Sequence, residues 1–136
     1  MPYPVTMIYA ALLGILLLML SWGVSRVRLR ESVSLGAGDV SGLESAIRAQ
    51  GNFIEYVPFA LILLMLAESA AATSWLLHLL GASLLVGRLL HAYGIQQPGS
   101  ANNYRKYGIA LTWLMIIVTC IYLLGVRAGI FSNAVM

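Results

Sequence analysis

Residues 5–24 read VTMIYAALLGILLLMLSWGV, twenty consecutive residues without a charged side chain. A membrane-spanning helix needs about 20 mostly apolar residues, because the hydrocarbon layer is roughly 30 Å thick and each residue rises about 1.5 Å. No Lys or Arg precedes this run, and Arg26, Arg28 and Arg30 follow it instead of a small-residue cleavage site. The pattern favours a retained membrane anchor over a secretory signal peptide.

Three further apolar runs follow, at residues 53–67, 75–87 and 109–126. The first of them is long enough to span a bilayer only if its helix starts near Gly42. The chain of 136 residues is 60% hydrophobic and 10% charged, whereas soluble domains carry roughly 25% charged residues. We therefore predict an all-α, integral membrane four-helix bundle with up-down connections. It would form a single domain over residues 1–136, with helices at about 4–26, 42–70, 74–95 and 104–128.

The positions of the basic residues predict the orientation in the membrane. Seven of the eight Lys and Arg residues lie in or beside the first and third connections, and Arg127 is alone on the other side. Positively charged connections stay cytoplasmic, so both termini are expected on the non-cytoplasmic side of a multi-pass protein, in a bacterial plasma (inner) membrane. Topology accounts for the net charge of +3, so no nucleic-acid partner is expected. Glu68, near the non-cytoplasmic end of the second helix, is expected to be solvated.

The second helix carries an unusual polar face. Glu44, Arg48, Asn52 and Glu55 are spaced by four, four and three residues, which places them on one side of a helix. Charges at membrane depth cost roughly 2.5–3.5 kcal/mol each, so they face a bundle interior or a wet cavity. Arg48 and Glu55 can partly neutralise each other. A ligand site and a buried polar network that holds the helices together both fit this face.

The predicted cytoplasmic end gathers further cationic and phenolic groups: Arg28, Arg30, Arg88, His91, Tyr93, Tyr104, Arg105 and Tyr107. Arginine binds carboxylates through a bidentate fork and glutamate can bind an ammonium group, so a small zwitterionic or anionic ligand is expected. Cys120, the single cysteine, is not placed to react, so a nucleophilic thiolate would have to come with the ligand. Two distant histidines and one cysteine predict no metal site.

Residues 48–58 read RAQGNFIEYVP and resemble the Arg-x-x-x-Asn-x-x-Glu-Tyr-x-Pro signature of the MAPEG family. These are the membrane-associated proteins of eicosanoid and glutathione metabolism, which include the microsomal glutathione transferases. The segment Gly87-Arg88-Leu89-Leu90-His91 is similar to the end of the family's third helix. Length, helix number and the basic end of the first helix extend the resemblance over nearly the whole chain.

The resemblance implies a homotrimer that binds glutathione, as co-substrate, between neighbouring subunits at the cytoplasmic side. Carried over by position, the glutathione-binding residues would be Arg48, Asn52, Glu55, Tyr56, Arg88 and His91. Arg28 or Arg30 would match the helix-one arginine, and Arg105 the catalytic arginine that stabilises the thiolate. Ile95 stands where the family has a helix-three tyrosine, and Tyr93 is the nearest substitute.

The function expected from this resemblance is a glutathione-dependent membrane transferase. It would conjugate glutathione to lipophilic electrophiles, reduce lipid hydroperoxides, or do both. Two alternatives stay open. Ile95 in the tyrosine position fits a non-catalytic membrane protein that binds glutathione or a lipophile. A small four-helix transporter could use Glu55 as its coupling carboxylate, although residues 1–24 lack the helix-one carboxylate that such proteins often have.

Overall fold

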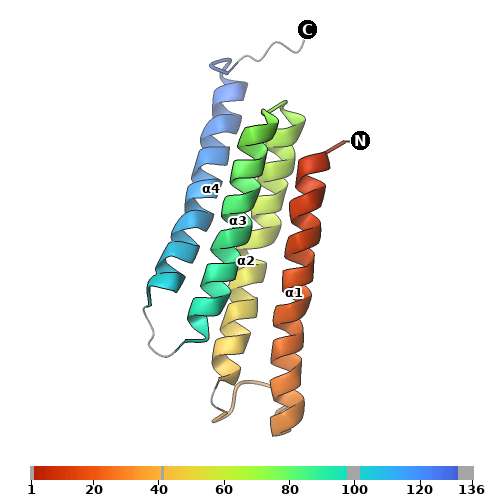
Figure 1. Cartoon of the computed structure of the whole chain (residues 1–136), viewed down its shortest axis with the longest axis vertical. Coiled ribbons are helices and arrows are strands. Elements are labelled where there is room, and N and C mark those ends of the chain that lie inside the picture. Colours follow the sequence, from red (N-terminus) through yellow and green to blue (C-terminus); the bar gives the residue numbers. More distant parts are fainter. Residues whose placement is uncertain (1, 41, 98–101, 132–136) are drawn as a thin grey trace.

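The computed structural model describes residues 2–40, 42–97 and 102–131, and it confirms an all-α four-helix membrane bundle. The helices are α1 (Pro4–Glu31), α2 (Leu43–Ser69), α3 (Ser74–Ile95) and α4 (Asn103–Arg127). They alternate in direction, so α1 begins and α4 ends at the same end of the bundle (Figure 1). All four are long and apolar enough to cross a membrane.

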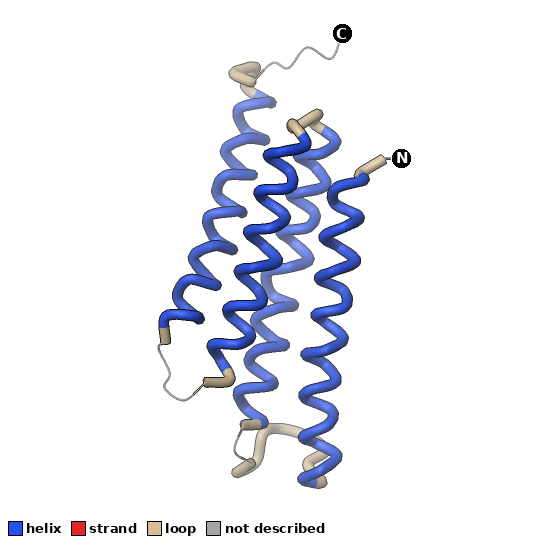
Figure 2. Tube along the Cα trace, in the orientation of Figure 1, coloured by secondary structure: helices blue, strands red, loops and turns tan. Residues whose placement is uncertain are grey.

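The antiparallel pair α2–α3 forms the centre of the bundle. In the described part of the chain α1 and α4 each contact both central helices and do not contact each other. Figure 1 shows them on opposite sides of the pair. The tube trace in Figure 2 shows that α1 and α3 end, and α2 and α4 begin, at the end of the bundle opposite the short turn between α2 and α3. This arrangement brings the basic ends of α1, α3 and α4 to the same end.

Apolar side chains fill the interior and also cover much of the outside. Leu13 of α1, Phe53 and Leu64 of α2, Leu84 of α3 and Met115 of α4 are at most 3% exposed. Large apolar side chains on the outward faces are mostly exposed, as Leu18 and Trp22 are in α1. Soluble monomers rarely expose such continuous apolar surface, so the bundle is built for lipid on the outside.

The first helix is longer than the apolar run predicts. It ends at Glu31 rather than near residue 26. Arginine is a good helix former, so the change to charged residues ends the apolar segment without ending the helix. Ser32, in the left-handed conformation, stops it by donating its backbone N–H to the Arg28 carbonyl. The predicted N-cap of α2, Ser41, lies outside the described residues.

The sequence suggested that Glu68 is solvated, but in the structure its side chain has partners in another helix. Its carboxylate accepts hydrogen bonds from the backbone N–H groups of Val5 and Thr6, each at 2.8 Å. The first N–H groups of a helix have no partner within the helix, and the N-terminal end of its dipole favours a negative charge. Glu68 therefore caps α1 from α2 and fixes the height of one helix against the other.

Candidate functional site

A cleft of about 360 Å³ opens between α2, α3 and α4, toward the end of the bundle where α3 connects to α4. Its lining residues are Asn52 and Tyr56 of α2, His91 of α3, and Arg105, Lys106, Ile109 and Trp113 of α4. Two cations, a phenol, an imidazole and an amide thus meet beside apolar side chains. This combination suits a ligand with charged groups and an apolar partner molecule.

Arg88 lies behind the cleft and is the most unusual buried residue of the bundle. Its side chain is 1% exposed. One terminal nitrogen, Nη1, donates to Asn52 Oδ1 at 2.6 Å, and the guanidinium carbon lies 5.7 Å from the centre of the Tyr56 ring. The other two nitrogens, Nε and Nη2, are buried without an acceptor among the described residues. Buried cations need partners, so Arg88 gives the site a strong preference for a negative charge nearby.

Glycines hold α3 and α4 close together beside the cleft. A Cβ atom added to Gly108 would lie 2.5 Å from the His91 backbone nitrogen and 2.6 Å from the Gly87 carbonyl oxygen. A Cβ atom added to Gly87 would lie 2.9 Å from the Gly108 carbonyl oxygen. Small residues let membrane helices approach each other closely. The contact places His91 against the first two turns of α4.

The start of α4 is fixed by Asn102. Its side-chain oxygen accepts from the Arg105 backbone N–H at 3.0 Å, and its amide nitrogen donates to the Gly94 carbonyl oxygen. An asparagine at this position is a favourable helix N-cap. Because one side chain binds both the end of α3 and the start of α4, it sets the position from which Arg105 reaches the cleft.

The structure brings together five of the predicted site residues. Asn52, Tyr56, His91 and Arg105 line the cleft, and Arg88 lies directly behind Asn52 and Tyr56. They come from three helices, yet the α2–α3 pair and the glycine contact with α4 place them in one region.

Arg48 and Glu55 lie on the outward face of α2, and both are exposed. No ion pair joins them within the described residues, in contrast to the neutralisation that their sequence positions suggested. They are two turns apart, and both side chains face away from the other three helices. Each is nevertheless one turn from Asn52, so they border the cleft on its outer side.

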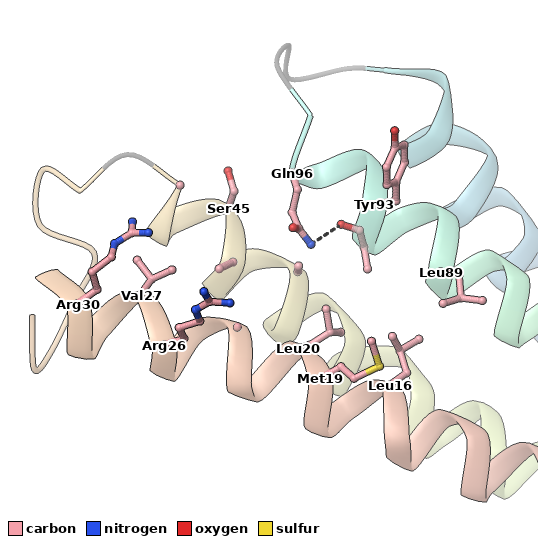
Figure 3. Close-up of a pocket in the computed structure, with 15 residues that line it drawn as sticks. Leu16, Met19, Leu20, Arg26, Val27, Arg30, Ser45, Leu89, Tyr93 and Gln96 are labelled. Carbon is pink, nitrogen blue, oxygen red and sulfur yellow. Dashed lines mark hydrogen bonds between the residues drawn. The ribbon is translucent and has the colours of Figure 1, made fainter.

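Arg28, Arg30 and Tyr93 lie away from the cleft. Arg28 donates to the Gly36 carbonyl oxygen at 2.8 Å and closes the first connection, while Arg30 pairs with Glu31 at 2.6 Å. The Tyr93 ring packs edge-on against Tyr104, with 5.1 Å between ring centres. In Figure 3, Arg30 and Tyr93 appear instead around a second hollow, between α1 and α3.

Three residues of the cleft were not predicted from the sequence: Lys106, Ile109 and Trp113. Arg105, Ile109 and Trp113 are spaced by four residues each, and Lys106 and Ile109 by three, so they share one helix face. That spacing was the available signal. The signal is weak, because a lysine at this position also marks membrane topology and an aromatic residue commonly lies at a membrane interface.

Comparison with known proteins supports the family resemblance over most of the chain. The model of the MAPEG family matches residues 6–125. The chain is 38% identical over 114 residues to the inner membrane protein YecN of Escherichia coli strain K12, covering 84% of this chain and 86% of that protein. The YecN protein of E. coli O6:H1 strain CFT073 matches to the same extent. These relatives agree with the prediction of a multi-pass protein of a bacterial inner membrane. The chain belongs to the MAPEG family.

Proposed function

We propose that the protein is a glutathione-dependent transferase that acts on lipophilic electrophiles delivered by the membrane. Buried Arg88 carries the proposal, because two of its nitrogens lack an acceptor among the described residues, beside a cleft that also holds Arg105 and Lys106. The family takes its name from glutathione and eicosanoid metabolism, and the cationic cleft fits a peptide with two carboxylates. The inner-membrane location of the relatives fits a substrate dissolved in lipid.

The charged groups of glutathione have counterparts around the cleft. Its two carboxylates would bind the cations of α3 and α4, with bidentate hydrogen bonds where arginine is the donor. Arg48 and Glu55 border the cleft on the outer face of α2, where Glu55 can bind the ammonium group. A second copy of the chain packed on this face would close the site. The proposal therefore includes the homotrimer that the family resemblance implies.

The chemistry would follow from a stabilised thiolate. The glutathione thiol gives its proton to water, and the guanidinium of Arg105 stabilises the sulfur anion by charge and hydrogen bonding. The sulfur electron pair forms a bond to the electrophilic carbon, and the leaving group departs with the electron pair of the broken bond. With a lipid hydroperoxide, two glutathione molecules are oxidised to the disulfide, and the hydroperoxide is reduced to an alcohol and water.

The test is conjugation of glutathione to a chromogenic aryl halide by the purified protein in detergent. We expect turnover by the wild type and a loss of about 100-fold in Arg105→Ala, the size typical for removing one donor that stabilises a developing anion. Arg127→Ala, at the opposite end of α4, is the matched control and should keep full activity. Arg48→Ala should raise the glutathione concentration needed for half-maximal rate.

A second candidate, a non-catalytic glutathione-binding protein, is favoured by one observation. Ile95 ends α3, and Tyr93 is held against Tyr104 outside the cleft, so no helix-three tyrosine lines the cleft. Calorimetric titration with glutathione separates the two. Binding without turnover of aryl halides or hydroperoxides would establish the binder, and absence of binding by the wild type would refute both.

A further inference from the structure

A second hollow, here called the α1–α3 groove, runs along the other side of the bundle. It measures about 740 Å³ and lies between α1 and α3, with α2 as its floor (Figure 3). Leu16, Met19 and Leu20 form one wall, and Leu89 and Ala92 belong to the other. It shares no lining residue with the cleft of the candidate site. The groove is therefore separate from the candidate site.

Small residues make the groove deep. Its floor includes Ala46 and Ala49 of α2, and Gly23 of α1 lies along its wall. A Cβ atom added to Gly23 would meet nothing within 4 Å. The walls are open to the surroundings, since Met19 is 65% and Leu89 48% exposed. An apolar groove that opens sideways from a membrane helix bundle is accessible to the acyl chains of the surrounding lipids.

The end of the groove nearest the α1–α2 connection is cationic. Arg26 and Arg30, one turn apart on α1, both line it and project toward α2 (Figure 3). Ser45 adds a hydroxyl group at the same end. Arg30 binds Glu31 through Nε, whereas Arg26 makes no hydrogen bond or ion pair with any described residue. The groove is therefore apolar along its length and positive at its end.

We propose that the α1–α3 groove binds an anionic phospholipid, with one acyl chain along Leu16 and Met19 and the phosphate at Arg26 and Arg30. The predicted orientation places this end in the cytoplasmic leaflet, which is rich in anionic lipids, and basic pockets between helices at that surface bind their headgroups. The open side leaves room for the second acyl chain in the bilayer. The inference stands independently of the proposed glutathione chemistry.

A second copy of the chain is the rival occupant. The charges that most need cover from another copy, those of Arg48 and Glu55, lie on a different face of α2 from Ala46 and Ala49. A copy that covers them leaves the α1–α3 groove facing lipid. The positive charge of Arg26 and Arg30 complements an anionic headgroup, which favours the phospholipid over a second copy.

Native mass spectrometry of the delipidated protein in detergent tests the proposal, with dioleoyl phosphatidylglycerol, dioleoyl phosphatidylcholine and oleic acid as probes. We expect one phosphatidylglycerol per chain on the wild type. Gly23→Leu should fill the groove and abolish this binding. Gly14→Leu is the matched control, because a Cβ at Gly14 of the same helix also meets nothing within 4 Å and Gly14 does not line the groove. Arg26→Gln should weaken binding about fivefold, and Arg127→Gln should not.

Four results would overturn the proposal. Equal binding of phosphatidylcholine would show an apolar groove without headgroup recognition. Oleic acid that displaces phosphatidylglycerol from the wild type would identify a free fatty acid as the occupant. Unchanged lipid binding by Gly23→Leu would place the lipid elsewhere. A change of oligomeric state in Gly23→Leu, with Gly14→Leu unaffected, would show that a second copy fills the groove.

Discussion

Arg88 shows how one buried charge can define a site in a membrane bundle. Its Nη1 has an acceptor on α2 and its guanidinium lies over the Tyr56 ring, while Nε and Nη2 have no acceptor in the described chain. Breaking a buried charged interaction is far more costly than replacing both partners with apolar groups. A bound anion would satisfy the remaining donors only when present, so the residue couples stability to ligand binding.

Removing Asn52, the one acceptor that the described residues offer Arg88, should therefore destabilise the bundle. We expect Asn52→Ala to lower the free energy of unfolding by roughly 1.5–3 kcal/mol, the usual range for a hydrogen bond to a charged group. Thermal unfolding in detergent, followed by circular dichroism, measures this. Asn52→Asp keeps an acceptor and should retain stability. Adding Arg88→Met to Asn52→Ala should restore part of it, and an Asn52→Ala protein that unfolds at the wild-type temperature would refute the interaction.

The sequence was informative about which residue types form the site and less so about how they meet. Arg48, Asn52 and Glu55 were placed on one helix face by spacing alone. The structure divides that face, because Asn52 turns toward Arg88 while Arg48 and Glu55 point outward. The division depends on the rotation of α2 against α3 and α4, which follows from packing of residues distant in sequence and leaves no local signal.

At the scale of helices, long apolar runs identified all four elements and the short turn between α2 and α3. Their ends were harder to predict, because a membrane span and a helix end for different reasons. The hydrocarbon layer limits the apolar run, whereas α1 continues through its arginines until Ser32 caps it. The Glu68 cap of α1 also had no local signature, since the two N–H groups that it binds lie more than 60 residues away in the chain.

The contact between α3 and α4 depends on the absence of a side chain at Gly108. A methyl group there would meet backbone atoms of α3, which cannot move aside as a flexible side chain would. We expect Gly108→Ala to destabilise the protein by about 1–3 kcal/mol through overpacking and to weaken glutathione binding by displacing α4. Thermal unfolding and calorimetry measure the two effects. Gly14→Ala, which meets nothing within 4 Å, should be as stable as the wild type or more so. Equal stability of Gly108→Ala would contradict the described helix spacing.

For the whole molecule, the outward face of α2 is the strongest argument for assembly. Glu55 lies 12 residues from Leu43, roughly 18 Å along the helix axis. That distance places it well inside a hydrocarbon layer of about 30 Å, where a charge exposed to lipid would cost roughly 2.5–3.5 kcal/mol. Glu55 is exposed in the single chain. A bundle alone in lipid would leave this cost uncompensated, whereas copies packed on the α2 face would remove it.

The protein should therefore behave as an oligomer that depends on this face. Light scattering on the detergent-solubilised protein, with the detergent subtracted, should give a mass of about 44 kDa for the proposed homotrimer, three times the 14.7 kDa of one chain. Arg48→Glu should dissociate the assembly. The substitution places a second negative charge one turn from Glu44, and it removes the only cation of this face. Arg127→Glu, at the far end of α4, should leave the mass unchanged. A wild-type mass of one chain would refute assembly. A dissociated Arg48→Glu protein that still binds glutathione at wild-type affinity would show that one chain holds a complete site.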